Sequence, residues 1–158
     1  MERVYEKYAW VILLAVGLLW MMVGIVAVFQ PEGIGEMDVQ SVTNMSWSEL
    51  KASSPAAADF VNFVYGQSGM HGIHAAFFVI VITLTGYRKG EKWAWYTMVS
   101  VPVYLVSGAL FAAIFIGDLA QMLAFIPITT IALLGLLLPY RKFFPRSPPS
   151  NLSNINAK

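Results

Sequence analysis

Cysteine is absent from the 158 residues, and charged residues make up only 12% of them. Without cysteine the chain cannot form disulfides, thiolate metal sites, iron–sulfur clusters or thiol redox centres. The net charge of +1 provides no overall field that would recruit nucleic acid. Phosphate loops, nucleophile elbows and dinucleotide fingerprints are missing as well. Any catalysis would therefore depend on His, Asp, Glu, Tyr, Ser or Thr.

Hydrophobic residues, in contrast, make up 58% of the chain, against about 45–50% in soluble proteins. Four apolar stretches are each about as long as a helix that crosses the roughly 30 Å hydrocarbon core. They cover about residues 8–29, 68–87, 93–116 and 119–138. The first stretch is longer than the apolar part of a signal peptide, so we expect a retained helix. The sequence predicts an all-α membrane protein, a bundle of four transmembrane helices.

We expect this four-helix domain to cover residues 1–145. Residues 146–158 are rich in Ser, Pro and Asn, and this composition predicts a disordered cytoplasmic tail. Lys and Arg near the ends of the expected helices indicate the orientation. Two lie at the N-terminus, three in the middle turn and four at the C-terminal end, against one in the loop 30–67 and none at 117–118. We therefore expect a multi-pass protein of the cell membrane with both termini cytoplasmic.

The loop 30–67 is expected on the extracytoplasmic side, with short amphipathic helices. Ser46 and Glu49 have the spacing of a capping box at a helix start. A break near Ser53-Ser54-Pro55 and a new helix beginning with Pro55 should follow. We expect that helix to lie in the membrane interface before it bends inward, and Gly33-Ile34-Gly35 to be irregular.

A short basic turn between the second and third expected helices is followed directly in the sequence by aromatic residues. Basic residues next to tryptophan and tyrosine are typical of a chain that leaves and re-enters the bilayer on the cytoplasmic side. Four to eight bases are usual in clusters that attract anionic lipid, so three bases in this turn should mainly set the topology. The residues predicted at the lipid interface are Arg88, Lys89, Lys92, Trp93, Trp95 and Tyr96.

Three stretches carry a resemblance to a known group of proteins. They are Trp47-Ser48-Glu49-Leu50, residues 55–65, and Tyr-Arg-Lys-Gly-Glu-Lys-Trp-Ala-Trp-Tyr at 87–96. The chain is similar to small, uncharacterised prokaryotic four-helix integral membrane proteins with a basic Gly-Glu-basic-Trp-Ala-Trp turn. In outline it also resembles DoxX-like proteins. The resemblance implies a compact four-helix bundle and no settled activity.

Small residues and prolines within the expected helices indicate how they pack. Gly17 and Gly24 are seven residues apart, so they share a helix face that another helix could approach closely. Pro102 and Pro127 interrupt neighbouring helices, and two such prolines can open a cavity.

The chain has two histidines, His71 and His74, which share one helix face. The expected topology brings Asp118 to the same outer side. Two imidazoles and a carboxylate would suit zinc or non-haem iron, or proton transfer. Alternatively, the histidines meet water or lipid head groups, and Asp118 is the N-cap of the fourth helix. A divalent metal is the one cofactor that this pattern suggests.

No charged residue lies in the middle of an expected span, which argues against a pump or channel. We expect an accessory subunit of a membrane complex or a binder of an apolar ligand. The alternative is a membrane enzyme, an isomerase or oxidoreductase acting on a lipid or quinone through His71, His74 and Asp118 at the outer face. The expected partners are the lipid bilayer and either further copies of the chain or a larger membrane complex.

Overall fold

The computed structural model describes residues 4–116 and 119–145, and in this part of the chain all regular secondary structure is helical, without strands. Four helical stretches are long and apolar enough to cross a membrane: Glu6–Phe29, Pro55–Tyr87, Lys92–Phe115 and Met122–Phe143. The prediction of an all-α chain with four helices of membrane-spanning length is therefore confirmed. The tail 146–158 lies outside the described residues.

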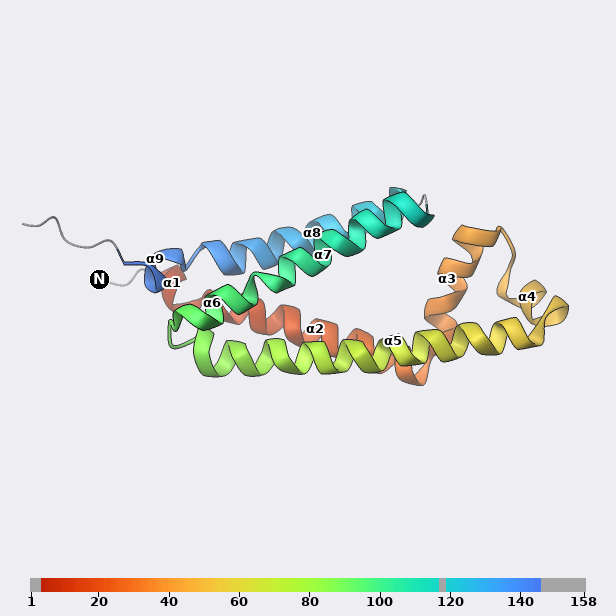
Figure 1. Ribbon diagram of the computed structural model, residues 1–158, viewed down its shortest axis with the longest axis horizontal. Helices are drawn as coiled ribbons and strands as arrows, with labels where there is room; N and C mark the ends of the chain where they lie inside the picture. Colours follow the sequence, from red (N-terminus) through yellow and green to blue (C-terminus); the bar gives the residue numbers. More distant parts are fainter. Residues whose placement is uncertain (1–3, 117–118, 146–158) are drawn as a thin grey trace, which may run out of the picture.

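The elements follow one another as two long hairpins with a helical loop between the first two long helices (Figure 1). The first hairpin pairs α2 with α5 and its π-helical last turn η1, and the second pairs α6–α7 with α8. The bounds are α1 (Val4–Tyr8), α2 (Trp10–Phe29), α3 (Pro31–Thr43), α4 (Trp47–Ser53), α5 (Pro55–Ile82), η1 (Thr83–Tyr87), α6 (Lys92–Met98), α7 (Ser100–Phe111), the π-helical η2 (Ala112–Ile116), α8 (Leu119–Leu137) and α9 (Tyr140–Phe143).

Glycines hold α2 and α5 close together. A Cβ atom on Gly69 would lie 2.7 Å from the carbonyl oxygen of Gly24, and one on Gly17 would lie 2.9 Å from the side chain of Ile80. Only glycine allows backbones to approach this closely. The prediction that Gly17 and Gly24 form a packing face is confirmed.

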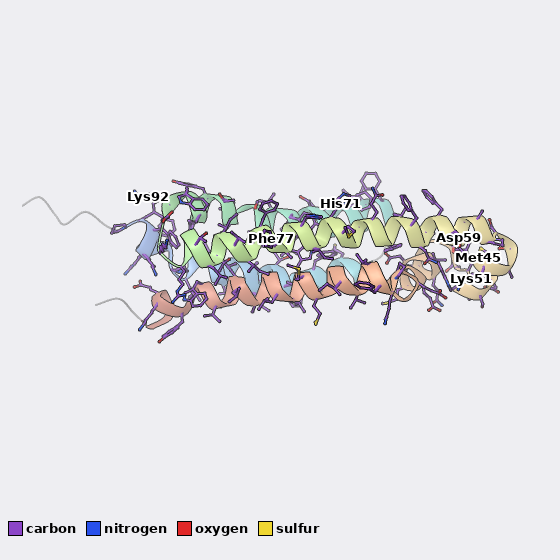
Figure 2. All side chains as sticks on the ribbon, turned by 90° about the horizontal axis from the view of Figure 1, so that it is seen from below. Met45, Lys51, Asp59, His71, Phe77 and Lys92 are labelled. Carbon is purple, nitrogen blue, oxygen red and sulfur yellow. The ribbon has the colours of Figure 1, made fainter. Side chains whose placement is uncertain are left out.

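The two hairpins meet at one end and diverge toward the other (Figure 1). At the closed end Gly135 of α8 lies against α2, since a Cβ atom there would be 3.1 Å from the side chains of Ile12 and Leu13. Lys92 lies near this end, and Met45, Lys51 and Asp59 lie at the opposite end (Figure 2). The molecule is therefore packed tightly at the Lys92 end and open between the hairpins farther along.

The second long helix differs from the expected span 68–87. It starts at Pro55 and continues without interruption through Ile82, so the expected inward bend is wrong. Gly66 and Gly69, which weaken an isolated helix, stay helical, and Gly69 does so at the close contact with α2. The first half of α5 extends beyond α2, and the loop helices α3 and α4 pack on it.

The loop 30–67 forms a small packed unit on this extension. Val39, Trp47 and Ala58 from α3, α4 and α5 share a buried apolar cluster. The expected irregular stretch at 33–35 is wrong, because α3 is helical there and Gly35 packs against α5.

Polar contacts fasten the same unit. The Ser46–Glu49 capping box at the start of α4 is confirmed, with the Ser46 amide 2.7 Å from the Glu49 carboxylate. Lys51 pairs with Glu32 at 2.6 Å, and this hydrogen bond holds the pKa of Glu32 below its usual value. The Tyr65 hydroxyl donates to Asp38.

Candidate functional site

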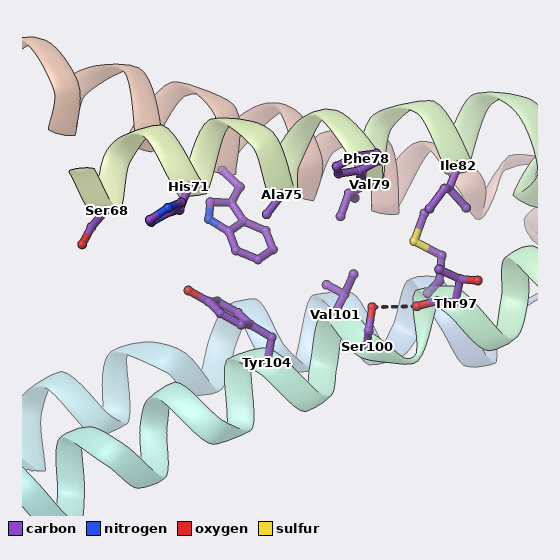
Figure 3. A pocket seen from close by; sticks show the side chains of 13 residues that line it. Ser68, His71, Ala75, Phe78, Val79, Ile82, Thr97, Ser100, Val101 and Tyr104 are labelled. Carbon is purple, nitrogen blue, oxygen red and sulfur yellow. Dashed lines mark hydrogen bonds between the residues drawn. The ribbon is translucent and has the colours of Figure 1, made fainter. Parts of the chain in front are cut away.

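A cavity of about 540 Å³ lies between α5 and the α6–α7 segment (Figure 3). It occupies the region where the two hairpins separate. The lining side chains come from α2, α5, α6 and α7: Trp20, Ser68, His71, Gly72, Ala75, Phe78, Val79, Ile82, Thr97, Met98, Ser100, Val101 and Tyr104. Its size lies in the range of small-molecule sites, about 300–1,000 Å³, and most of its walls are apolar, as in such sites.

Proline helps to form the wall on the α6–α7 side. Pro102 has no N–H for the carbonyl of Met98, one turn earlier, and the helix divides at Val99 into α6 and α7. The hydroxyl of Ser100 donates to the carbonyl oxygen of Thr97 at 2.6 Å. The expected helix interruption is confirmed, although the cavity lies between the hairpins and none of its lining residues comes from α8, the helix that contains Pro127.

The rings of Trp20 and Tyr104 bridge the hairpins, with their centroids 4.8 Å apart. Both side chains also line a second cavity of about 440 Å³, which is bounded by α2, α7 and α8. The ring pair therefore borders both cavities.

Polar groups gather on one side of the larger cavity, where Figure 3 shows Ser68, His71 and Tyr104. Within the described part of the chain, the imidazole of His71 and the hydroxyls of Ser68 and Tyr104 have no hydrogen-bond partner. The hydroxyls of Thr97 and Ser100 at the other side are already bonded to backbone carbonyls. Free donors and acceptors are therefore concentrated near His71, and the remainder of the cavity offers apolar contact.

The position of His71 along its helix differs from expectation. It lies sixteen residues from either end of the stretch Pro55–Tyr87 and is not at the start of the helix. At 1.5 Å per residue it is about 24 Å along the helix from Tyr87.

The two histidines have different surroundings. His71 lines the cavity, whereas His74 is not among its lining residues, and its Nδ1 lies 2.8 Å from the carbonyl oxygen of Met70. Among the residues that the structure describes, no three His, Asp or Glu side chains are grouped closely enough to hold a metal ion. Asp118 lies outside the described residues, so the predicted His71/His74/Asp118 site stays a prediction.

The residues predicted at the lipid interface lie at the closed end of the molecule, and several have further contacts. Arg88 lies over the ring of Trp10 at 4.9 Å, and Lys92 lies over the ring of Phe144 at 5.7 Å. The indole of Trp95 is half-buried and donates to the Leu136 carbonyl at 3.0 Å. Lys89, Trp93 and Tyr96 are exposed, as expected of residues in an interface.

Sequence reasoning placed Tyr87 only in the turn and missed its structural role. The side chain is 1% exposed, and its hydroxyl donates to the carbonyl oxygen of Gly135 at 2.8 Å. Proline at 139 lacks the N–H that would otherwise bond this carbonyl, four residues earlier in the helix. Pro139 was the sequence signal that could have revealed this role of Tyr87. A proline at this position leaves a carbonyl of α8 without its helical N–H donor, so another element must supply one.

No protein-family model, curated protein sequence or solved structure matches this chain. The site itself is a mostly apolar cavity between two helical hairpins, with one imidazole and two hydroxyls on one side that have no hydrogen-bond partner among the described residues.

Proposed function

We propose that this protein binds an amphipathic small molecule, with one compact polar group and an apolar body, in the cavity between its two hairpins. The observation that carries the proposal is the division of the cavity into a polar side and an apolar side. Ser68, His71 and Tyr104 would receive the polar group, and Val79, Ile82 and their neighbours would contact the apolar body. A few placed polar groups in an apolar cavity give orientation and specificity.

The distribution of charged residues along the molecule supports a placement of the protein in the membrane. The four long helices would cross the bilayer with the Lys92 end cytoplasmic, because the bases gather there and most acidic residues of the loop lie at the other end. The hairpins would then separate in the outer half of the membrane. A molecule already dissolved in the bilayer could enter sideways between α5 and α7.

A membrane enzyme acting on such a molecule is the second candidate, and the unpaired imidazole of His71 favours it. Histidine titrates near neutral pH and can exchange a proton with a ligand. The Tyr104 hydroxyl on the same side of the cavity could donate a hydrogen bond to a ligand oxygen. The binding function requires only these contacts, whereas the enzyme would also change the ligand chemically.

The test is to purify the chain from its native membranes in mild detergent, extract it with organic solvent and identify bound molecules by mass spectrometry. We expect one class of amphipathic molecule at about one per chain. His71→Ala and Ala75→Phe, which remove a polar contact and fill the cavity, should each lower recovery severalfold. His74→Ala and Val81→Phe are matched controls, because neither position lines the cavity.

Equal recovery from all four variants would refute the proposal. A chemically altered molecule recovered with the wild type, and unaltered with His71→Ala, would favour the enzyme.

A further inference from the structure

Two basic segments far apart in the sequence lie together at the closed end of the molecule. The first is the turn 88–92, and the second is α9 with its neighbours. Lys142 joins them, since its Nζ donates to the Arg88 carbonyl oxygen at 3.0 Å. Its alkyl chain covers Gly90, where a Cβ atom would lie 3.2 Å from the Lys142 side chain. Gly90 has φ +83°, a backbone conformation that favours glycine at this position of the turn.

The assembled surface carries more positive charge than either segment. Its described bases are Lys7, Arg88, Lys89, Lys92, Arg141 and Lys142, and its described acids are Glu6 and Glu91. Six bases and two acids leave a net charge of +4 on this surface. One of the two carboxylates, Glu91, accepts a hydrogen bond from the Trp93 indole. The turn alone has fewer bases than a lipid-binding cluster, but the assembled surface falls within the usual four to eight.

Arg88 is held in a defined position on this surface. Its guanidinium lies over the face of the Trp10 ring, 4.9 Å from the centroid. A cation–π contact of this kind involves the face of the ring and uses none of the guanidinium N–H groups as a hydrogen-bond donor to oxygen. The side chain is exposed, and none of the described residues accepts a hydrogen bond from it. A fixed planar fork with free donors matches two oxygens of a phosphate group.

We propose that this surface binds the phosphate head group of an anionic phospholipid in the leaflet at this end of the protein. Arg88 contacts the phosphate through paired N–H donors, and Lys89 and Lys92 add attraction. A lipid fits better than a soluble phosphate because exposed Trp93 and Tyr96 flank the bases on α6. Aromatic side chains of this kind sit at the head-group level, where acyl chains continue beside them.

The test measures lipid binding to the purified full chain in neutral detergent, by native mass spectrometry with added phosphatidylglycerol or phosphatidylcholine. We expect tighter binding of phosphatidylglycerol. Arg88→Gln and Lys89→Gln should each weaken it about fivefold, as each base near a membrane surface contributes about 1 kcal/mol. Lys51→Gln, at the opposite end, is the control and should leave binding unchanged. Lys89 has no contact that the fold needs, so Lys89→Gln still tests the proposal if Arg88→Gln fails to fold.

Two results would overturn the proposal: equal binding of phosphatidylcholine, or wild-type affinity for phosphatidylglycerol in both Arg88→Gln and Lys89→Gln. Inorganic phosphate at millimolar concentration should not displace the lipid; displacement would assign the surface to a free anion instead. The site is separate from the cavity, so His71→Ala should bind phosphatidylglycerol normally. The outcome therefore tests this surface independently of the proposed function.

Discussion

Replacing Tyr87 with phenylalanine tests how the two hairpins are joined. The change removes one hydroxyl from a side chain that is 1% exposed and keeps the ring, whose centroid lies 4.7 Å from that of Phe143. The hydroxyl donates to the Gly135 carbonyl oxygen at 2.8 Å. Without it, that carbonyl has no donor, because Pro139 cannot supply one.

The expected loss of stability follows from the burial of this carbonyl. Leaving a buried acceptor unsatisfied costs about 1–3 kcal/mol, whereas side-chain hydrogen bonds within membrane proteins average about 0.6 and reach about 1.7 kcal/mol. We therefore expect Tyr87→Phe to lower the free energy of unfolding by about 1–2 kcal/mol. Reversible unfolding in mixed micelles, by titration with sodium dodecyl sulfate and circular dichroism, measures this quantity.

Tyr96→Phe is the matched control, because Tyr96 is 61% exposed and its hydroxyl has no bond within the described residues. It should leave the unfolding free energy within about 0.5 kcal/mol of the wild type. A double-mutant cycle with Pro139→Ala isolates the cause. Alanine restores an N–H at position 139 that can bond the Gly135 carbonyl, so Tyr87→Phe should cost less in that background. If Tyr87→Phe costs no more than Tyr96→Phe, or costs as much in the Pro139→Ala background as in the wild type, the reasoning is wrong.

Two further predictions concern the α2–α5 contact and the loop. Gly69→Ala should lower the unfolding free energy by about 1–3 kcal/mol in the same assay, because its Cβ would lie 2.7 Å from the Gly24 oxygen; Gly66→Ala, with no atom within 4 Å, should not lower it. Hydrogen bonds from Ser46 hold the pKa of Glu49 below its ordinary value. The capping box should therefore stabilise α4 fully above about pH 4.3 and lose this effect as the pH falls through the lower folded-state pKa. The protection of the α4 amides, taken as the exchange rate relative to that of an unstructured chain at the same pH, should fall over that range in the wild type and show no such step in Glu49→Gln. Identical protection profiles in both would contradict the reasoning.

Several local features could be predicted because they depend on neighbours in the sequence. The capping box needs only Ser46 and Glu49 three residues apart, and the helix start at Pro55 needs only a proline after a break. The glycine face of α2 follows from the helical repeat. The continuity of this helix from Pro55 into the expected span 68–87 could not be predicted, because Gly66 and Gly69 weaken a helix locally and the close contact of Gly69 with α2 is not visible in the sequence.

The candidate site was predictable only in part. His71 was predicted as a candidate metal ligand or proton-transfer group, and prolines indicated that a cavity could form. The partners of His71 in that cavity, Ser68 and Tyr104, were not foreseen, because Tyr104 comes from a helix more than thirty residues away. Which of the two histidines faces the cavity depends on the rotation of α5 against α2, and glycine contacts set that rotation.

From the sequence one can predict that the chain is helical, roughly which stretches form its four long apolar helices and which segments carry the bases. A long apolar stretch that crosses a bilayer must satisfy its own backbone hydrogen bonds, so its composition favours a helix. The three-dimensional structure was needed to show how far the hairpins diverge, which side chains share the cavity, and that Tyr87 bonds the carbonyl left free by Pro139. These depend on contacts between distant segments, where glycine permits close approach and bulky rings such as Trp20 and Tyr104 hold the helices apart.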